Sequence, residues 1–188
     1  MEFKKEKIIC DTREQKNQHI INYFKKNNIE YKIQKIDEGD YKLEDNDTIC
    51  IERKGNLNEI MSNITQARFK RELERAKQKG VKLIVLIENS SGIHSIEEIP
   101  EKWKNQRLEF YKFQLKRQLG LFGDFNEWYL YREANTKGLK VRRPPQSPTQ
   151  LMKSLRTIEE NKEDYDCHFE FCSKAETGCR IIELLSQK

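Results

Sequence analysis

The amino-acid sequence predicts an α/β fold, with a mixed β-sheet flanked by helices and an α-rich C-terminal extension. Residues 81–87 are almost all apolar, which is typical of a strand covered on both faces. Residues 31–36 alternate apolar and polar side chains, as a half-buried strand does. Between the strand-like segments, apolar residues recur at helical spacing.

Each expected element of the first half is bounded by a local signal. Asn27 and Asn28 end the first helix, and Gly80 is placed to cap the second. The acidic run 44–47 is a turn between two strands. The expected elements are a strand at 7–10, a helix at 15–28, a hairpin over 31–54, one long helix over 57–79 and the buried strand at 81–87.

A proline-rich break divides the second half. Residues 142–148 are expected to be extended because they contain three prolines. Ser147 with Pro148 favours a helix start, and the spacing of Ser173 and Glu176 predicts another. The elements expected here are helices at 103–119 and 150–160, a strand at 127–131 and a last helix beyond 176. The predicted division is a core at 1–92, a basic continuation of the same domain at 93–143, and a helical extension at 144–188.

Composition excludes several classes of protein. The 188 residues suit one domain, and nine Phe, seven Tyr and two Trp are too many aromatics for a disordered polyelectrolyte. The chain has no run of about 18 apolar residues, which excludes a transmembrane span. Five cysteines without a C-x-x-C pair argue against a disulfide scaffold, and residues 1–6 contain no apolar signal core. We therefore expect a protein of the reducing cytoplasm, with no membrane partner.

The positive charge is concentrated in one stretch. The net charge of +5 combines about +1 over residues 1–100, about +6 over 101–143 and about −2 over 144–188. In this stretch the basic residues are interleaved with aromatic ones, as on surfaces that track phosphates and stack bases. An equally simple interpretation is the solvated face of an amphipathic helix. The candidate DNA contacts are Lys112, Lys116, Arg117, Arg142 and Arg143.

The strongest candidate site is formed by Asp40, Glu52 and Lys54. Side chains alternate along a strand, so Glu52 and Lys54 project from the same face. Asp40 lies near the base of the partner strand of the expected hairpin, where its carboxylate can approach Glu52. Two carboxylates suit a hard cation such as Mg²⁺, and a lysine beside it can offset charge that develops on a phosphate. The pattern also arises by chance in a chain with 36% charged residues, but a buried strand has little reason to carry Glu and Lys inward.

Together with its neighbours, this triplet resembles a known family. The motifs in order are Asp11-Thr12-Arg13-Glu14, Gly39-Asp40-Tyr41, Ile51-Glu52-Arg53-Lys54, and Arg68-Phe69 with Glu72, followed by a strand that ends at Glu88. Over about residues 7–90 this order resembles the XPF-type nuclease domain, a branch of the PD-(D/E)XK nucleases. The joint occurrence of the motifs is far more specific than any one of them.

The resemblance implies a restriction-endonuclease-like sheet, a DNA substrate, Mg²⁺ or Mn²⁺ as cofactor, and a homodimer formed through the nuclease domain. It implies that Asp40 and Glu52 bind the metal with help from Asp11, and that Lys54 is the catalytic lysine. Arg13 and Arg53 match positions of the motif that support the site or contact phosphate. Arg68 and Arg71 on the following helix are candidate DNA contacts, with salt bridges as the alternative.

Two departures from the family pattern stand out. Asn58 occupies the position at which the family motif has Asp, and it keeps the oxygen but loses the charge. No pair of helix-hairpin-helix domains follows residue 90, so selection of branched or flap DNA is less secure than phosphodiester cleavage. Residues 92–188 would have to supply the substrate contacts.

Other chemistries are disfavoured. Cys167, His168, Cys172 and Cys179 lack the two short-spaced ligand pairs of a zinc site. His19 is expected at the surface, without a Ser or Cys nucleophile beside it. The resemblance therefore implies a metal-dependent DNA endonuclease, for which branched or flap DNA is one candidate substrate. The rivals are a non-catalytic DNA-binding or scaffold protein that retains the fold, and a nuclease acting on RNA.

Overall fold

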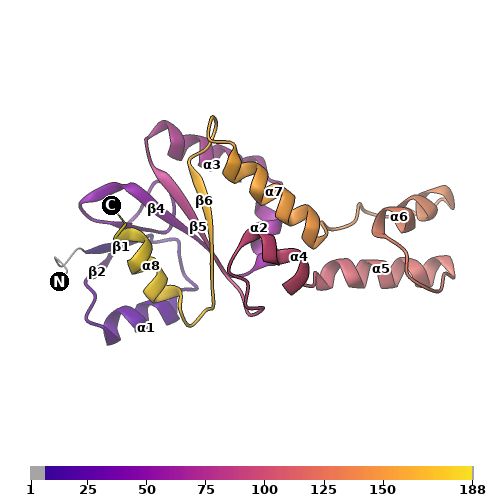
Figure 1. Ribbon diagram of the computed structural model, residues 1–188, viewed down its shortest axis with the longest axis horizontal. Coiled ribbons are helices and arrows are strands. Elements are labelled where there is room, and N and C mark those ends of the chain that lie inside the picture. Colours follow the sequence, from indigo (N-terminus) through magenta and orange to yellow (C-terminus); the bar gives the residue numbers. More distant parts are fainter. Residues whose placement is uncertain (1–6, 188) are drawn as a thin grey trace.

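The computed structural model describes residues 7–187 and is built on one six-stranded sheet with the order β2-β1-β3-β4-β5-β6 (Figure 1). β1 is parallel to β2 and antiparallel to β3, β3 is antiparallel to β4, and β4, β5 and β6 run parallel. The sheet is mixed, as predicted. Residues 1–6, in which no apolar signal core is expected, lie outside the described residues. The strands are β1 Ile8–Cys10, β2 Tyr31–Ile33, β3 Tyr41–Leu43, β4 Asn46–Lys54, β5 Lys82–Glu88 and β6 Cys167–Cys172.

Helices cover both faces of the sheet. One hydrophobic cluster packs α2, α3, α4 and α7 against one face, and another packs α1 and α8 against the opposite face. β5 lies between them and is buried along nearly its whole length, as its apolar run predicts. The helices are α1 Gln18–Lys26, α2 Leu57–Asn63, α3 Ala67–Gln78, α4 Ile99–Lys102 after a 3₁₀ turn at Ile96–Glu98, α5 Gln106–Leu119, α6 Glu127–Thr136, α7 Pro148–Glu160 and α8 Thr177–Leu185.

Several helix boundaries follow the local sequence signals. Ser147 caps α7 in a complete capping box with Gln150, and Pro148 occupies the first turn, which confirms the predicted start. Gly80 has a φ of 69° just beyond the end of α3, the left-handed conformation that glycine adopts most easily. Residues 137–147 between α6 and α7 have no regular structure, in agreement with the expected break.

The hairpin predicted over residues 31–54 is wrong in its first strand. β2 leaves the hairpin and pairs parallel to β1, whereas β3 and β4 form the hairpin, with the turn at Glu44 and Asp45. The intervening chain is held by Asp11, whose Oδ2 accepts the Ile36 amide at 2.7 Å. The chain after β2 is thus anchored near the end of β1. In the sheet, β2 flanks β1 on one side and the β3–β4 hairpin flanks it on the other.

The long helix expected over residues 57–79 is two helices, α2 and α3, separated by residues 64–66. Ile60 and Phe69 are both buried against the same side of the sheet. Nine residues separate them, which in one continuous helix would place them on opposite faces at about 100° per residue. The break therefore lets both segments bury their apolar sides.

Two elements of the second half differ from the prediction. Residues 127–131, predicted as a strand from their aromatic content, begin α6, in which Leu130 and Ala134 are buried one turn apart. β6 was missed, although Phe169 and Phe171 alternate with polar residues as strand residues do. Residues 144–188 thus contribute a strand to the central sheet as well as two helices.

α5 and α6 project from the sheet domain as an arm, which we define as residues 106–143 (Figure 1). The arm has its own small core of Leu115, Leu119, Leu130 and Ala134. Its base is fixed by Asn105, which is 2% exposed. Asn105 caps α5 through its Oδ1, and its Nδ2 donates to the Gln146 carbonyl at 2.8 Å on the returning chain.

The described residues include no helix that is both long and apolar enough to cross a bilayer. All five cysteines are free thiols. Cys167 and Cys172 are buried at the two ends of β6, where they pack as small hydrophobic side chains.

Candidate active site

The structure brings Asp40, Glu52 and Lys54 together at the end of the β3–β4 hairpin. Asp40 directly precedes β3, whose Tyr41 pairs with Ile51 of β4, so Asp40 lies beside the Ile51–Arg53 segment that contains Glu52. The Asp40 amide donates to the Ile51 carbonyl at 2.7 Å, and Asp40 Oδ2 accepts the Arg53 amide at 2.8 Å. Lys54 Nζ lies 2.6 Å from Glu52 Oε1. The alternation predicted for β4 therefore places the two carboxylates and the ammonium group in one site.

Gly39 is required by this geometry. Its φ is 74°, and a Cβ there would lie 3.0 Å from the Ile51 carbonyl oxygen and 3.2 Å from Cys50 Cβ. The residue that precedes Asp40 must therefore adopt a left-handed conformation in contact with the backbone of β4.

We expect Gly39→Ala to destabilise the fold by about 1–3 kcal/mol, because it combines backbone strain with a backbone clash. The same change should move Asp40 and lower the activity of the site. Chemical denaturation and single-turnover cleavage measure the two effects. Gly138→Ala is the matched control, since it has a φ of 76° but nothing within 4 Å of an added Cβ. Equal destabilisation by the two variants would contradict the close-approach argument.

The electrostatics of the site leave negative charge poorly balanced. Burial, followed by the nearby Glu52 charge, raises the pKa of Asp40 to about 8. Burial works to lower the pKa of Lys54, but the Glu52 and Asp40 carboxylates outweigh it and raise that pKa. Lys54 therefore stays charged, while Asp40 resists ionisation unless a further cation is present.

A pocket of about 260 Å³ opens beside Glu52 and Lys54. Lys54 Nζ lies 5.8 Å from the centre of the Phe69 ring, which forms one wall. Glu72 on α3 also faces this pocket, and burial followed by the Glu52 charge raises the pKa of its carboxyl group. The sequence motif contains Glu72 but does not predict that this residue lines the pocket. The other lining residues are Glu59, Asn63, Gln66 and Arg68.

Asp11 is close to the site, but its carboxylate is fully engaged. Its amide donates to the Asp40 carbonyl at 2.8 Å. Its Oδ1 accepts the Arg13 amide and Nε, and its Oδ2 accepts Arg13 Nη2 and the Ile36 amide. Burial opposes ionisation, but these hydrogen bonds outweigh it and lower the pKa of Asp11. The structure thus places buried Asp11 and exposed Arg13 as a clamp on the loop that leads to Asp40, and the metal and DNA roles proposed for them stay predictions.

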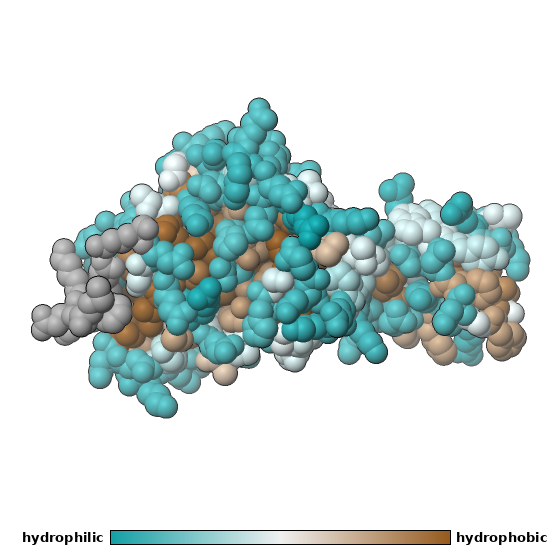
Figure 2. Space-filling view, in the orientation of Figure 1, coloured by the Kyte–Doolittle hydropathy of each residue, from teal (hydrophilic) through white to brown (hydrophobic). Residues whose placement is uncertain are grey.

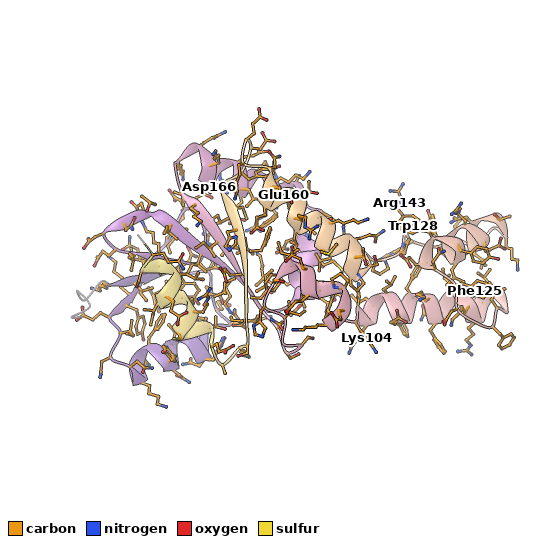
Figure 3. The ribbon with its side chains drawn as sticks, viewed as in Figure 1. Lys104, Phe125, Trp128, Arg143, Glu160 and Asp166 are labelled. Carbon is orange, nitrogen blue, oxygen red and sulfur yellow. The ribbon has the colours of Figure 1, made fainter. Side chains whose placement is uncertain are left out.

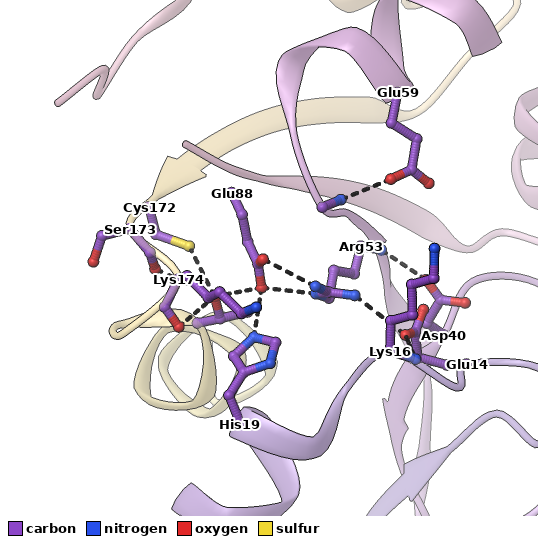
Figure 4. A network of polar contacts seen from close by, with 12 residues as sticks. Glu14, Lys16, His19, Asp40, Arg53, Glu59, Glu88, Cys172, Ser173 and Lys174 are labelled. Atoms are coloured by element: carbon purple, nitrogen blue, oxygen red, sulfur yellow. Dashed lines mark hydrogen bonds and ion pairs between the residues drawn. The ribbon is translucent and has the colours of Figure 1, made fainter. Parts of the chain in front are cut away.

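Arg53 faces the opposite side of the sheet from Glu52 and Lys54, within a buried ionic network (Figure 4). Its Nε and Nη2 donate to Glu88 at 2.7 and 2.9 Å, and its Nη1 donates to Glu14 at 3.2 Å. Glu88 also interacts with His19 Nε2 at 2.7 Å and accepts the Thr177 hydroxyl at 2.8 Å. His19 is therefore a partner of this network and not the isolated surface residue expected.

The network fixes the backbone of β4 at Arg53. The Arg53 amide in turn donates a hydrogen bond to the Asp40 carboxylate, so the network helps to position Asp40. Arg53 has no side-chain route to the pocket in this arrangement and acts as a positioning residue. Arg53, Glu14 and Glu88 are predicted by the sequence motifs, whereas the contacts of Glu88 with His19 and Thr177 are not.

The donor set fits a hard divalent cation. Mg²⁺ is commonly held by one or two carboxylates and completes its shell with water and substrate oxygens. Asp40 and Glu52 supply two carboxylates, and a bound cation would offset the charge that raises the Asp40 pKa. Within residues 7–187, no group of three or more Cys, His, Asp or Glu side chains is arranged to hold a metal ion. A site built here would therefore rely on water and phosphate oxygens for most of its ligands.

Asn58 lies outside this pocket. It lines a second hollow of about 420 Å³, together with Glu88 and the base of the arm, and its buried Oδ1 has no hydrogen-bond partner. The position at which the family motif carries Asp thus presents an unsatisfied oxygen.

The predicted DNA contacts lie in two places. Arg68 lines the 260 Å³ pocket, and Arg71 is exposed on the same helix, α3. The five predicted contacts of the second half belong to the arm, where Lys112 lies 3.9 Å from Glu109 and Lys116 donates to the Gly123 carbonyl. In the described part of the chain, Arg117, Arg142 and Arg143 form no ion pair. The five arm residues are therefore separate from the carboxylates, and their DNA contacts stay predictions.

Comparisons with known proteins agree with this architecture. The family model of the ERCC4 domain matches residues 10–185. The structure of XPF from Aeropyrum pernix superimposes with a TM-score of 0.55 at 13% identity, covering 95% of this chain and 63% of that one. The structure of the same protein in complex with DNA gives a TM-score of 0.55, 13% identity and coverages of 96% and 63%. A search of curated protein sequences gave no significant match.

The chain spans less than two thirds of the length of these solved structures, and at this level of identity the superposition shows a shared fold. The family model extends over the sheet, the arm and the last helix, well beyond the motifs of the first half. The chain therefore belongs to the ERCC4 domain family and has the fold of the XPF-type nuclease domain.

Proposed function

We propose that this protein is a metal-dependent DNA endonuclease that hydrolyses phosphodiester bonds at the Asp40–Glu52–Lys54 site. The observation that carries the proposal is the half-buried Asp40 carboxylate beside Glu52, whose pKa is raised to about 8 by burial and by the Glu52 charge despite the nearby Lys54. Ionising a carboxylate in such an environment costs folding free energy, and strongly perturbed groups of this kind cluster at functional sites.

Asp40 and Glu52 would hold Mg²⁺ or Mn²⁺, which when bound supplies an activated water and a polarised phosphodiester. Lys54 is fixed by Glu52 and packs against Phe69, so its ammonium group is already oriented before substrate arrives. It can orient the attacking water and offset the charge that develops on the phosphate. Arg53 and Gly39 fix the backbone positions of these groups.

Three features support DNA as the substrate. The chain belongs to a family of nuclease domains, and one structure of similar fold is of XPF in complex with DNA. The excess positive charge lies on the arm, where it can attract phosphates without neutralising the carboxylates. Branched or flap DNA and a homodimer are the finer proposals that the resemblance implies.

The second candidate is a DNA-binding scaffold that retains the nuclease fold without activity. Its support is Asn58, which lacks the charge of the family Asp and leaves Oδ1 unpartnered. Asp40, Glu52 and Lys54 argue against it, since a scaffold does not need two half-buried carboxylates beside a lysine.

A cleavage assay separates the two candidates. Purified protein is incubated with single-stranded, duplex, flap, fork and junction DNA in Mg²⁺, Mn²⁺ or EDTA, and products are resolved by denaturing electrophoresis. We expect 3′-hydroxyl or 3′-phosphate ends to appear with the metals and no product with EDTA. Tight binding of these DNAs without cleavage in either metal would favour the scaffold, and cleavage that persists in EDTA would contradict the metal-dependent mechanism.

A further inference from the structure

One face of α5 carries exposed aromatic rings that the core of the arm does not use. Phe110 is 61% exposed and Phe113 is 59% exposed, whereas Leu108 and Leu115 on the other side are buried. Gln106, Phe110, Phe113 and Arg117 follow at intervals of four, three and four residues, so they line one side of the helix. We call these four residues the α5 ridge.

The arm exposes further large hydrophobic side chains besides its many charged residues. Hydrophobic side chains gather at its far end, whereas hydrophilic residues cover most of the sheet domain on the same face of the molecule (Figure 2). Phe122, just beyond α5, is 94% exposed. Exposed aromatic residues in such density mark a binding surface more often than a solvated one.

The charge of the ridge favours an anionic partner. Arg117 stands beside Phe113 on the ridge and forms no ion pair with any other described residue. The whole of α5 carries four basic residues against one acidic residue. Rings beside an unpaired cation on a basic helix suit a chain that alternates bases and phosphates, whereas the centres of protein–protein interfaces are depleted in charge.

The ridge begins at the second hollow, at the base of the arm. Gln106, its first residue, lines the 420 Å³ hollow that also contains Asn56 and Asn58 at the start of α2. Lys102 and Lys104 line the same hollow, and Figure 3 places Lys104 at the base of the arm. α2 lines both this hollow, through Leu57 and Asn58, and the 260 Å³ pocket, through Glu59 and Asn63.

We propose that the α5 ridge binds an unpaired strand of DNA, whose bases stack on Phe110 and Phe113 and whose phosphates contact Lys102, Lys104 and Arg117. This inference rests on the proposed nuclease function and names the part of the substrate that the arm recognises. From Gln106 to Arg117 the helix rises about 16 Å at about 1.5 Å per residue, which matches about five nucleotides at a stacked spacing of about 3.4 Å. The substrate is therefore DNA with an unpaired segment of about five nucleotides beside the cleaved strand.

Fluorescence anisotropy with a labelled twelve-nucleotide oligothymidylate tests the ridge directly. The measurement is made in EDTA, so that no cleavage occurs, and a twelve-base-pair duplex is the comparison ligand. Stacking contributes about 1–3 kcal/mol per base, so Phe110→Ala/Phe113→Ala should weaken oligothymidylate binding at least tenfold and duplex binding less than threefold. Phe110→Trp/Phe113→Trp should bind at least as tightly as the native protein, since it keeps the stacking surfaces.

The matched control is Ile33→Ala. Ile33 is 66% exposed on β2, at the opposite edge of the sheet from the arm, so its truncation should change neither affinity. In oligothymidylates shortened from twelve to three nucleotides, affinity should fall sharply below about five.

Three outcomes would overturn the inference. Unchanged oligothymidylate affinity in the alanine double variant would remove the stacking role. An equal loss for duplex and single strand would show a general phosphate surface. Conversion of a native dimer to a monomer by the double variant, with unchanged affinity, would assign the ridge to an interface between two copies. Because no metal or cleavage is involved, failure here leaves the nuclease proposal intact, and failure of the cleavage assay leaves this measurement valid.

Discussion

Asp40→Asn is expected to reduce cleavage about a hundredfold or more and, at the same time, to raise the melting temperature of the metal-free protein above pH 7. The loss of activity follows because an amide cannot supply the second anionic ligand beside Glu52. The gain in stability follows because the native Asp40 carboxyl has its pKa raised to about 8, chiefly by burial. Ionising it in the folded state costs free energy that the unfolded chain does not incur.

The pH dependence has a definite sign. Between the ordinary pKa of an aspartate and about 8, the folded protein binds more protons at Asp40 than the unfolded protein does, so stability falls as pH rises. Asp40→Asn lacks this pH-dependent loss of stability. The difference in melting temperature between the variant and the native protein should therefore grow from pH 5 to pH 8.5. A shift of a few degrees is expected, at about 2–4 °C per kcal/mol for a chain of this size.

Differential scanning calorimetry in EDTA and in Mg²⁺ provides the measurement. Mg²⁺ should raise the melting temperature of the native protein at pH 8 and leave that of Asp40→Asn nearly unchanged. Asp37→Asn is the control, because its carboxylate is 77% exposed and pairs only with Lys79 at 3.4 Å. Retained cleavage by Asp40→Asn would contradict the role of Asp40 as a metal ligand. A melting temperature below that of the native protein at pH 8 in EDTA would contradict its raised pKa.

Arg53→Met is expected to destabilise the fold by about 3–5 kcal/mol, the largest effect on stability among the changes considered. The guanidinium side chain is 6% exposed and bonds to Glu88, which is 4% exposed, and to Glu14. Removing it leaves two enclosed carboxylates without their main partner. The expected fall in melting temperature is about 6–20 °C, measured by calorimetry or by urea denaturation.

A double variant tests whether the effect comes from the network. Glu88→Gln removes one of the stranded charges, so Arg53→Met/Glu88→Gln should be less destabilised than the sum of the single variants. Arg156→Met is the surface control, because Arg156 pairs with Glu97 where both side chains are largely exposed, and it should cost less than about 1 kcal/mol. If Arg53→Met and Arg156→Met cost the same, the buried network does not have the role assigned to it.

Local patterns predicted those parts of the fold that depend on local chemistry. Each such pattern spans only a few neighbouring residues: the apolar run of β5, the capping box at Ser147 and the alternation along β4. The direction of β2, the break between α2 and α3 and the position of β6 depend on which surfaces meet across the sheet. For example, the need to bury both Ile60 and Phe69 is invisible until both are placed against the same face.

The same distinction applies to the site. Glu52 and Lys54 could be paired from the sequence because they are two residues apart on one strand, and Gly39-Asp40 formed a motif with them. The Arg53 network joins residues from α1, β4, β5 and α8, including His19 and Thr177, which are 158 positions apart in the chain. No spacing rule connects such residues. Asp11 shows the converse case, since its motif was recognised while its carboxylate serves Arg13 and Ile36.

The base of the arm has a consequence for how such proteins diversify. The chain leaves the sheet domain at Asn105 and returns at Gln146, and one hydrogen bond of 2.8 Å joins these two points. β5 and β6 pair in register from Leu83 with Cys167 to Glu88 with Cys172, although the arm lies between them in the sequence. The arm is thus a self-contained insertion, and a lineage could lengthen, replace or delete it without rebuilding the sheet that carries Asp40 and Glu52. Substrate choice and bond cleavage can then evolve as separate modules.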